Sequence, residues 1–134
     1  GVATPQYPAN FPGVLGVTAV DSGNHKADFA NYGDGWIDLA APGVGITSTV
    51  PFSPVLYAAW SGTSMAVPFV TGAAALVKQQ QPDAAPAEVA DRLIAAGADL
   101  DAANPQYAGQ LGRLLDISRA IGVAPVLYLP MVQR

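Results

Sequence analysis

The stretch SGTSMAVP, residues 61–68, joins two segments of opposite character. Before it, residues 55–60 (VLYAAW) are rich in apolar and β-favouring side chains, which is typical of a buried strand. After it, residues 66–80 are dominated by small and helix-forming side chains, and the first charge is Lys78. Ser64 is therefore predicted at a helix N-terminus, where unpaired N–H groups and the helix dipole stabilise a developing negative charge. This position suits a serine that attacks a carbonyl, and Gly62 allows a peptide backbone to approach closely.

Three further segments indicate strands. Short apolar runs at 14–20 and 36–40 are typical of strands covered on both faces. Residues 45–50 and 55–61 are separated by the turn-forming sequence PFSP. Their spacing predicts an antiparallel hairpin that leads directly into the serine turn.

Helices are expected at 64–80 and 86–96, each following a strand-like or turn-like segment. The second helix begins at Pro86, and Gly97 is expected to be its left-handed C-terminal cap. A short third helix is predicted after Asp116, a good N-cap residue. The pattern predicts one compact α/β unit to residue 122, and residues 123–134 form an apolar C-terminal tail.

Composition limits the classes of function. Hydrophobic residues make up 51% of the 134 residues and charged residues only 12%, about half the charged share of an average domain. A surface this poor in charge suggests a piece that is normally covered by the rest of a larger domain. The net charge of -4, with no basic cluster, argues against nucleic-acid binding. No apolar run is long enough to span a membrane, and the absence of cysteine excludes disulfides.

The sequence resembles the subtilisin-like serine peptidases at four places in family order. Residues 61–68 match that family's nucleophile motif, GTSMAxP, at every fixed position. Residues 7–21 (YPANFPGVLGVTAVD) are similar to the turn and strand after its oxyanion asparagine. Residues 29–43 include FANYG and DLAAPG, and residues 109–116 (GQLGRLLD) resemble its closing segment. The resemblance implies the C-terminal portion, residues 1–122, of a three-layer fold with a mostly parallel sheet.

The resemblance implies a serine endopeptidase that forms an acyl-enzyme on Ser64. A serine hydroxyl needs a general base, usually a histidine oriented by a carboxylate. In this family the aspartate, the histidine and the oxyanion asparagine precede the serine, so all three are expected upstream of residue 1. The one histidine, His25, lies in a predicted surface turn. The fragment alone is therefore predicted to be inactive.

The resemblance also assigns the surrounding residues. Thr63 is expected to position the oxyanion, and Ser61 and Gly62 to line the substrate cleft. The stretch 3–8 corresponds to a wall of the pocket for the substrate side chain before the scissile bond. Within it, Tyr7-Pro8 resembles a position where the family often has a cis peptide bond. The resemblance also implies that Met65 lies next to the nucleophile.

Two other functions compete with peptidase activity. One is a non-catalytic subtilisin-like module used for binding, which a replaced aspartate, histidine or asparagine upstream would indicate. The other is a hydrolase with a Gly-x-Ser-x-Gly nucleophile elbow. We discard it because Ala66 occupies the fifth position and no histidine follows Ser64.

The expected partners are a peptide or protein substrate and the missing N-terminal half of the domain. If that half is not present, the fragment is expected to associate with itself through the surface that the half would cover. No cofactor or metal site is assigned. Asp99 and Asp101 offer a calcium site in the parent protein, although a solvated loop is the preferred interpretation. No nucleic-acid or membrane partner is expected, and family resemblance implies an extracellular location.

Overall fold

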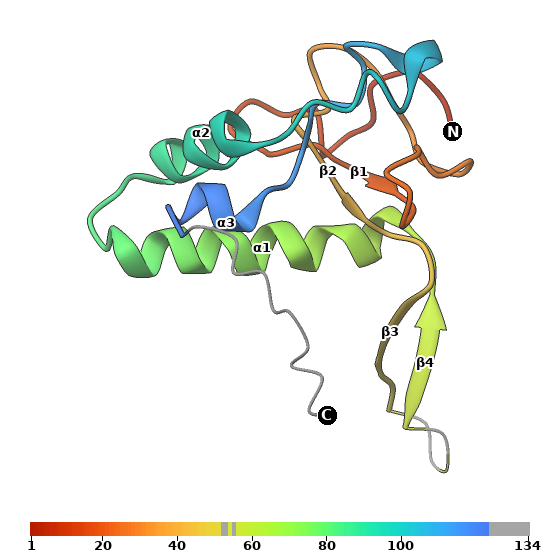
Figure 1. Ribbon diagram of the computed structural model, residues 1–134, viewed down its shortest axis with the longest axis horizontal. Helices are drawn as coiled ribbons and strands as arrows, with labels where there is room; N and C mark the ends of the chain where they lie inside the picture. Colours follow the sequence, from red (N-terminus) through yellow and green to blue (C-terminus); the bar gives the residue numbers. More distant parts are fainter. Residues whose placement is uncertain (52–53, 55, 124–134) are drawn as a thin grey trace, which may run out of the picture.

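The computed structural model describes residues 1–51, 54 and 56–123. It consists of an α/β body and a two-stranded hairpin that projects away from it (Figure 1). The first two strands of the body are β1 (Val17–Val20) and β2 (Leu39–Pro42), and a third is β5 (Arg113–Leu114). They form a parallel sheet in the order β1-β2-β5. The predicted parallel α/β fold is confirmed.

The hairpin pairs β3 (Ile46–Thr49) with β4 (Tyr57–Trp60) in antiparallel register. Ile46 faces Trp60 at the end nearest the body, and Thr49 faces Tyr57 at the far end. This confirms the predicted hairpin between residues 45 and 61. Its register places the end of β4 immediately before the serine turn.

Three helices follow along the chain, as predicted. They are α1 (Thr63–Gln80), α2 (Pro86–Ala96) and α3 (Ile117–Ala120). The side chain of Asp116 accepts a hydrogen bond from the Arg119 N–H at 2.9 Å, so the predicted N-cap of α3 is confirmed. A 3₁₀ helix, η1 (Pro105–Tyr107), lies within the loop that follows α2.

The predicted left-handed cap at Gly97 is wrong. Its backbone is extended, with φ −61° and ψ 148°. The structure gives a different reason for glycine at this position. A Cβ on residue 97 would lie 2.4 Å from the Cβ of Arg113. Glycine is needed here because the chain packs closely against β5, which requires space rather than a positive φ.

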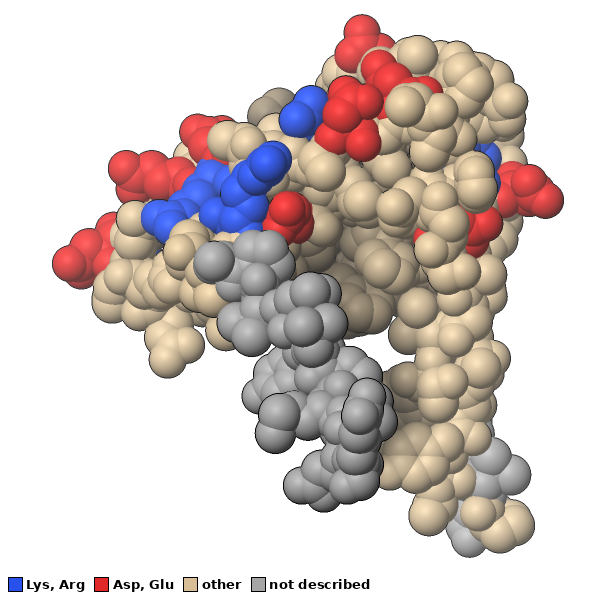
Figure 2. All heavy atoms as spheres, in the orientation of Figure 1, with Lys and Arg blue, Asp and Glu red and all other residues tan. Residues whose placement is uncertain are grey.

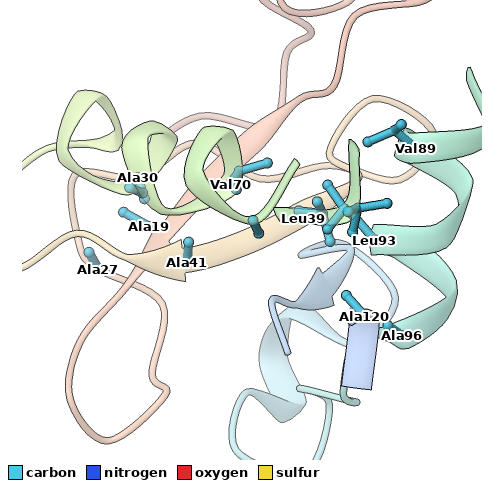
Figure 3. Packing of buried hydrophobic residues seen from close by; sticks show 13 residues of the cluster. Ala19, Ala27, Ala30, Leu39, Ala41, Val70, Val89, Leu93, Ala96 and Ala120 are labelled. Atoms are coloured by element: carbon cyan, nitrogen blue, oxygen red, sulfur yellow. The ribbon is translucent and has the colours of Figure 1, made fainter. Parts of the chain in front are cut away.

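The main hydrophobic core lies between the sheet and the helices (Figure 3). Buried side chains of α1 recur at positions 66, 70, 73 and 77, the spacing of one helical face. They pack with Leu39 of β2 and with Leu93 of α2, both fully buried. Small residues such as Ala19 and Ala41 let α1 lie close to the strands. This packing fixes the direction in which α1 leaves the serine turn.

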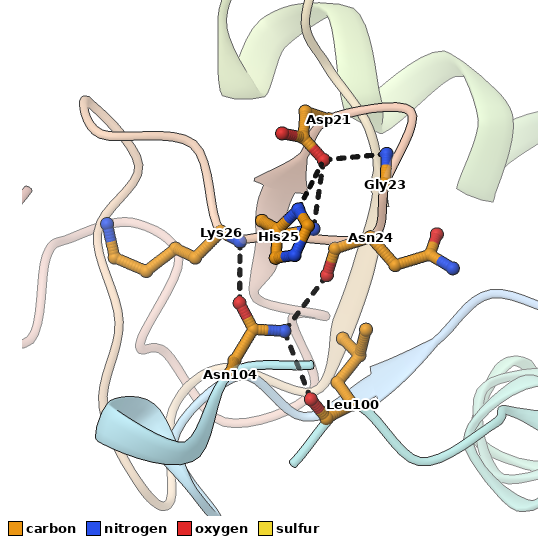
Figure 4. Close-up of polar contacts among 7 residues, drawn as sticks. All are labelled: Asp21, Gly23, Asn24, His25, Lys26, Leu100 and Asn104. Atoms are coloured by element: carbon orange, nitrogen blue, oxygen red, sulfur yellow. Dashed lines mark hydrogen bonds and ion pairs between the residues drawn. The ribbon is translucent and has the colours of Figure 1, made fainter. Parts of the chain in front are cut away.

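The opposite face of the sheet is covered by loops that one buried side chain joins (Figure 4). Asn104 is 4% exposed and makes three side-chain hydrogen bonds. Its oxygen accepts from the Lys26 N–H at 2.7 Å, and its amide donates to the carbonyls of Asn24 at 2.9 Å and Leu100 at 3.0 Å. The turn at 21–26 is thereby attached to a loop about 80 residues later.

The domain boundary at residue 122 stays a prediction. Apart from Val123, the predicted tail lies outside the described residues. In the part of the chain that is described, no helix combines the length and apolar character needed to cross a bilayer.

Candidate functional site

Ser64 is the second residue of α1, and its side chain is exposed. Gly62 is the N-cap, and its carbonyl accepts a hydrogen bond from the Met65 N–H at 3.0 Å. The first N–H groups of a helix have no partner four residues earlier, so the Ser64 N–H lacks one inside α1. The predicted placement at the start of a helix, with the hydroxyl facing outward, is confirmed. The hydroxyl and backbone N–H groups thus meet at the positive end of an 18-residue helix.

Two hydrogen bonds hold the serine turn to the end of the sheet. The Gly62 N–H donates to the Gly43 carbonyl at 2.8 Å. The Ser61 hydroxyl oxygen accepts from the Gly45 N–H at 2.9 Å. A Cβ at Gly43 would lie 2.6 Å from the Cβ of Ala19 and 2.8 Å from the Gly62 carbonyl oxygen. Glycine at residue 43 therefore lets the turn sit directly against the strands.

A groove of about 450 Å³ opens beside Ser64, between the hairpin and the first turns of α1. Apolar side chains form much of its wall. The residues on the α1 side are Ser64, Met65, Pro68 and Phe69, and those on the hairpin side are residues 46–50, Ala58 and Trp60. None of these lining residues has a side chain that titrates near neutral pH. The groove therefore presents the serine without a base to activate it.

Thr63 faces a different space from Ser64. It lines a cavity of about 120 Å³ together with Gln6, Ala9, Val17, Asn31, Trp36 and Ile37. Gln6 of the N-terminal segment thus lies beside the residue that precedes Ser64. The assignment of the stretch 3–8 to a substrate pocket stays a prediction. The indole N–H of Trp36 is the only buried side-chain polar atom among the described residues that lacks a hydrogen-bond partner.

The structure contains the cis peptide bond that resemblance indicated at Tyr7-Pro8. Both residues are exposed, and neither lines the groove or the Thr63 cavity. The Tyr7 ring lies 4.9 Å from that of Phe11, and the Tyr7 hydroxyl accepts from the Asn10 side chain at 3.3 Å. Their assignment to substrate binding stays a prediction.

His25 lies in the predicted surface turn and does not line the groove. Its Nδ1 is 3.5 Å from the Asp21 carboxylate, which also accepts backbone N–H groups of His25 and Gly23 at 2.9 and 2.8 Å. The hydrogen bond from the His25 backbone is the main reason that the pKa of Asp21 is lowered. Asp21 and His25 thus contact each other within their own turn, and His25 is not placed to act as a base for Ser64.

Lys26 has the other shifted pKa, and it also lies outside the groove. Burial lowers the pKa of its ammonium, and Asp28 partly opposes that shift. The Nζ atom is 4.8 Å from the centre of the Tyr107 ring and 5.3 Å from that of Tyr32. Lys26 therefore strengthens the contact between loops that Asn104 joins.

The acidic loop after α2 uses its aspartates locally. The Asp99 carboxylate accepts the Asp101 N–H at 2.9 Å and lies 3.6 Å from the Arg113 guanidinium. Asp101 accepts the Gly109 N–H at 2.9 Å. Within residues 1–51, 54 and 56–123, no group of three or more histidine, cysteine or acidic side chains is placed to hold a metal.

The sequence did not assign a role to several residues beside the serine. Trp60 and Phe69 form walls of the groove, and Asn31 lines the Thr63 cavity. Asn31 carries no local pattern that points to Thr63, since only tertiary folding brings it there. Gln6, in the stretch 3–8, lines the same cavity.

Comparison with known proteins agrees with this geometry. Residues 1–112 match the family model described as the subtilase family. Subtilisin BL of Lederbergia lenta is 49% identical over 82 residues, which are 61% of this chain and 29% of that protein. Among solved structures, a protease of Pseudoalteromonas arctica has a TM-score of 0.76 at 33% identity, over 87% of this chain and 37% of the other.

Fervidolysin of Fervidobacterium pennivorans, described as a keratinolytic enzyme related to subtilisin, has a TM-score of 0.75 at 30% identity. The match covers 89% of this chain and 20% of fervidolysin. The chain therefore spans only a part of each of these relatives. Because the family model covers most of its length, the chain belongs to the subtilase family.

Proposed function

We propose that Ser64 is the nucleophile of a serine endopeptidase whose remaining catalytic groups lie outside this chain. The observation that carries the proposal is the exposed Ser64 hydroxyl at the N-terminus of α1, on the edge of an open groove. A base in the missing part accepts the Ser64 proton while the oxygen attacks the peptide carbonyl. The Ser64 N–H, at the positive end of α1, then stabilises the oxyanion.

The leaving amine takes the proton from the base, and an acyl-enzyme is left on Ser64. Water, deprotonated by the same base, releases the acid product. Thr63, Ser61 and Gly62 are assigned to the oxyanion and substrate cleft, and Tyr7 and Pro8 to the substrate wall, by resemblance. The extracellular location is likewise proposed from the resemblance, which the bacterial subtilisins among the relatives support.

Activity should depend on the missing half. In this chain alone, the groove offers Ser64 no titratable partner, so we expect neither peptide turnover nor reaction with a fluorophosphonate. The test uses a chimera in which the part of Subtilisin BL that precedes the matched region is joined to the start of this chain. That part is expected to supply the base and the oxyanion asparagine.

The chimera is expected to cleave a generic peptide substrate and to be labelled by the fluorophosphonate. Ser64→Ala should abolish both, whereas Ser22→Ala, a serine in the exposed turn at 21–26, should leave both unchanged. Activity that survives Ser64→Ala would refute the assignment. A folded chimera without activity would favour the alternative, a non-catalytic binding module.

A further inference from the structure

No basic cluster is visible along the sequence, but folding brings three arginines together at the ends of α2 and α3. Arg92, Arg113 and Arg119 are three of the six Lys and Arg residues in the chain. They belong to α2, β5 and α3, respectively. Figure 2 shows blue Lys and Arg atoms concentrated where Figure 1 places α2 and α3. We call these three side chains the arginine cluster.

Two members of the cluster join the two helices reciprocally. The Arg92 Nε donates a hydrogen bond to the carbonyl of Ala120, the last residue of α3. The Arg119 Nη1 donates to the carbonyl of Ala96, the last residue of α2, at 3.4 Å. Each helix therefore uses an arginine to cap the C-terminal end of the other.

Arg113 reaches the same place from the sheet. Its Nε and Nη2 donate to the carbonyl of Gly97 at 3.1 and 2.9 Å. Gly97 directly follows Ala96, which accepts from Arg119. Because α2 also packs against α3, the three guanidinium groups lie on one small surface around the end of α2.

Helix capping does not use the whole charge of the cluster. The C-terminal end of a helix carries about half a negative charge. Two such ends and the Asp99 carboxylate, 3.6 Å from Arg113, offset about two of the three positive charges. Neither Arg92 nor Arg119 has an ion pair with a carboxylate in the part of the chain that is described. About one positive charge is therefore left without a counterion.

The cluster also keeps free hydrogen-bond donors. A guanidinium group has five N–H donors, and Arg92 and Arg119 each use one of them in contacts among the described residues. The Arg119 side chain is exposed, and Arg92 and Arg113 are partly exposed. Their backbone contacts hold the guanidinium groups in place, so a ligand would lose little affinity to the ordering of side chains.

We propose that the arginine cluster binds a phosphate group, either as the free ion or as a phosphomonoester. The planar fork of a guanidinium group matches the spacing of phosphate oxygens. Three guanidinium groups that come from different elements suit the several oxygens of a phosphate better than the two oxygens of a planar carboxylate. The red acidic side chains that border the blue atoms in Figure 2 would repel a long polyanion, so a single phosphate group fits this surface better than a nucleic acid.

The expected effect of the phosphate is to hold α2 and α3 together at their C-terminal ends. A ligand that binds only the folded chain stabilises it by mass action. No member of the cluster lines the groove beside Ser64. The inference therefore does not depend on the proposed peptidase activity, and phosphate should leave fluorophosphonate labelling of the chimera unchanged.

Isothermal titration calorimetry with sodium phosphate, at constant ionic strength, tests the site on the 134-residue chain. We expect one phosphate per chain, with a dissociation constant on the order of 1 mM. Arg92→Gln and Arg119→Gln should each weaken binding about tenfold, or 1.4 kcal/mol. Lys78→Gln is the matched control, because it also removes one charge and one bond to a carbonyl, that of Ala84, outside the cluster. It should stay within about twofold of the unsubstituted chain.

A variant that strengthens binding separates the site from a general loss of structure. Asp99→Asn removes the carboxylate that competes for Arg113, and it keeps an oxygen that can accept the Asp101 N–H. It should tighten phosphate binding about threefold, a change that unfolding cannot produce. Circular dichroism of each variant checks that the helices are retained.

Two further ligands identify the source and the shape of the anion. Glycerol 3-phosphate that binds more tightly than phosphate would indicate a phosphomonoester, and equal or weaker binding would indicate the free ion. Acetate should bind more weakly than either. The inference is overturned if phosphate does not bind, if acetate binds equally well, if Lys78→Gln weakens binding as much as the arginine variants, or if Asp99→Asn leaves the affinity unchanged.

Discussion

Replacing Asn104 by alanine should destabilise the fold more than any comparable change at an exposed asparagine. The substitution removes three hydrogen bonds, but the Leu100 carbonyl keeps bonds from the N–H groups of Ala103 and Asn104. The Lys26 N–H and the Asn24 carbonyl have no other hydrogen bond among the described residues. Each unpaired group that is removed from water costs about 1–3 kcal/mol.

Taking the lower half of that range, because the site borders solvent, we expect Asn104→Ala to lower the free energy of unfolding by about 2–4 kcal/mol. Urea unfolding followed by the fluorescence of the two tryptophans measures it as a lower midpoint at an unchanged slope. Asn10→Ala is the control, since its amide makes one exposed bond to Tyr7 and should cost less than about 0.5 kcal/mol. Equal midpoints for the two variants would refute the claim that Asn104 holds the loops together.

Two further predictions concern backbone geometry and pH. Gly109 and Gly112 both have positive φ, at 71° and 63°. A Cβ added at Gly109 would meet open space, whereas one added at Gly112 would lie 2.3 Å from the Asp38 carbonyl. Gly109→Ala should therefore cost about 1–2 kcal/mol in urea unfolding and Gly112→Ala clearly more, and equal costs would contradict the clash. The folded state lowers the pKa of Asp21, so the ionised Asp21 carboxylate stabilises the fold at neutral pH. This stabilisation is lost as the pH falls through the lowered pKa. Asp21→Asn should reduce the loss of thermal stability between pH 7 and pH 3, and an unchanged pH dependence would count against this linkage.

The sequence predicted those elements whose signals are local. The strand-to-helix change at residues 60–64 and the Pro86 and Asp116 helix starts were found because composition and capping act over a few residues. By contrast, β5 is only two residues long and is defined by pairing with β2, so no periodicity could reveal it. Asn104 was likewise missed as an anchor, since its partners lie about 80 residues away.

The position of Ser64 at the start of α1 could be predicted, but its surroundings could not. Gly97 shows the limit clearly, because the same glycine that suggests a helix cap is required here by the nearby Arg113 side chain. The buried face of α1 likewise became clear only in the structure, since only packing decides which face of a helix meets the sheet.

The hydrogen bonds that attach the serine turn divide the hairpin into a near end, where changes in length would move Ser64, and a far end, where they would not. Both bonds that hold the turn, from Gly62 to Gly43 and from Gly45 to Ser61, lie at the end of β3 and β4 nearest the sheet. Insertions or deletions beyond Thr49 and before Tyr57 add or remove chain at the far end, where neither bond is touched. The length of this arm can therefore change between descendants, and a new recognition loop can be grafted there, while Ser64 keeps its place.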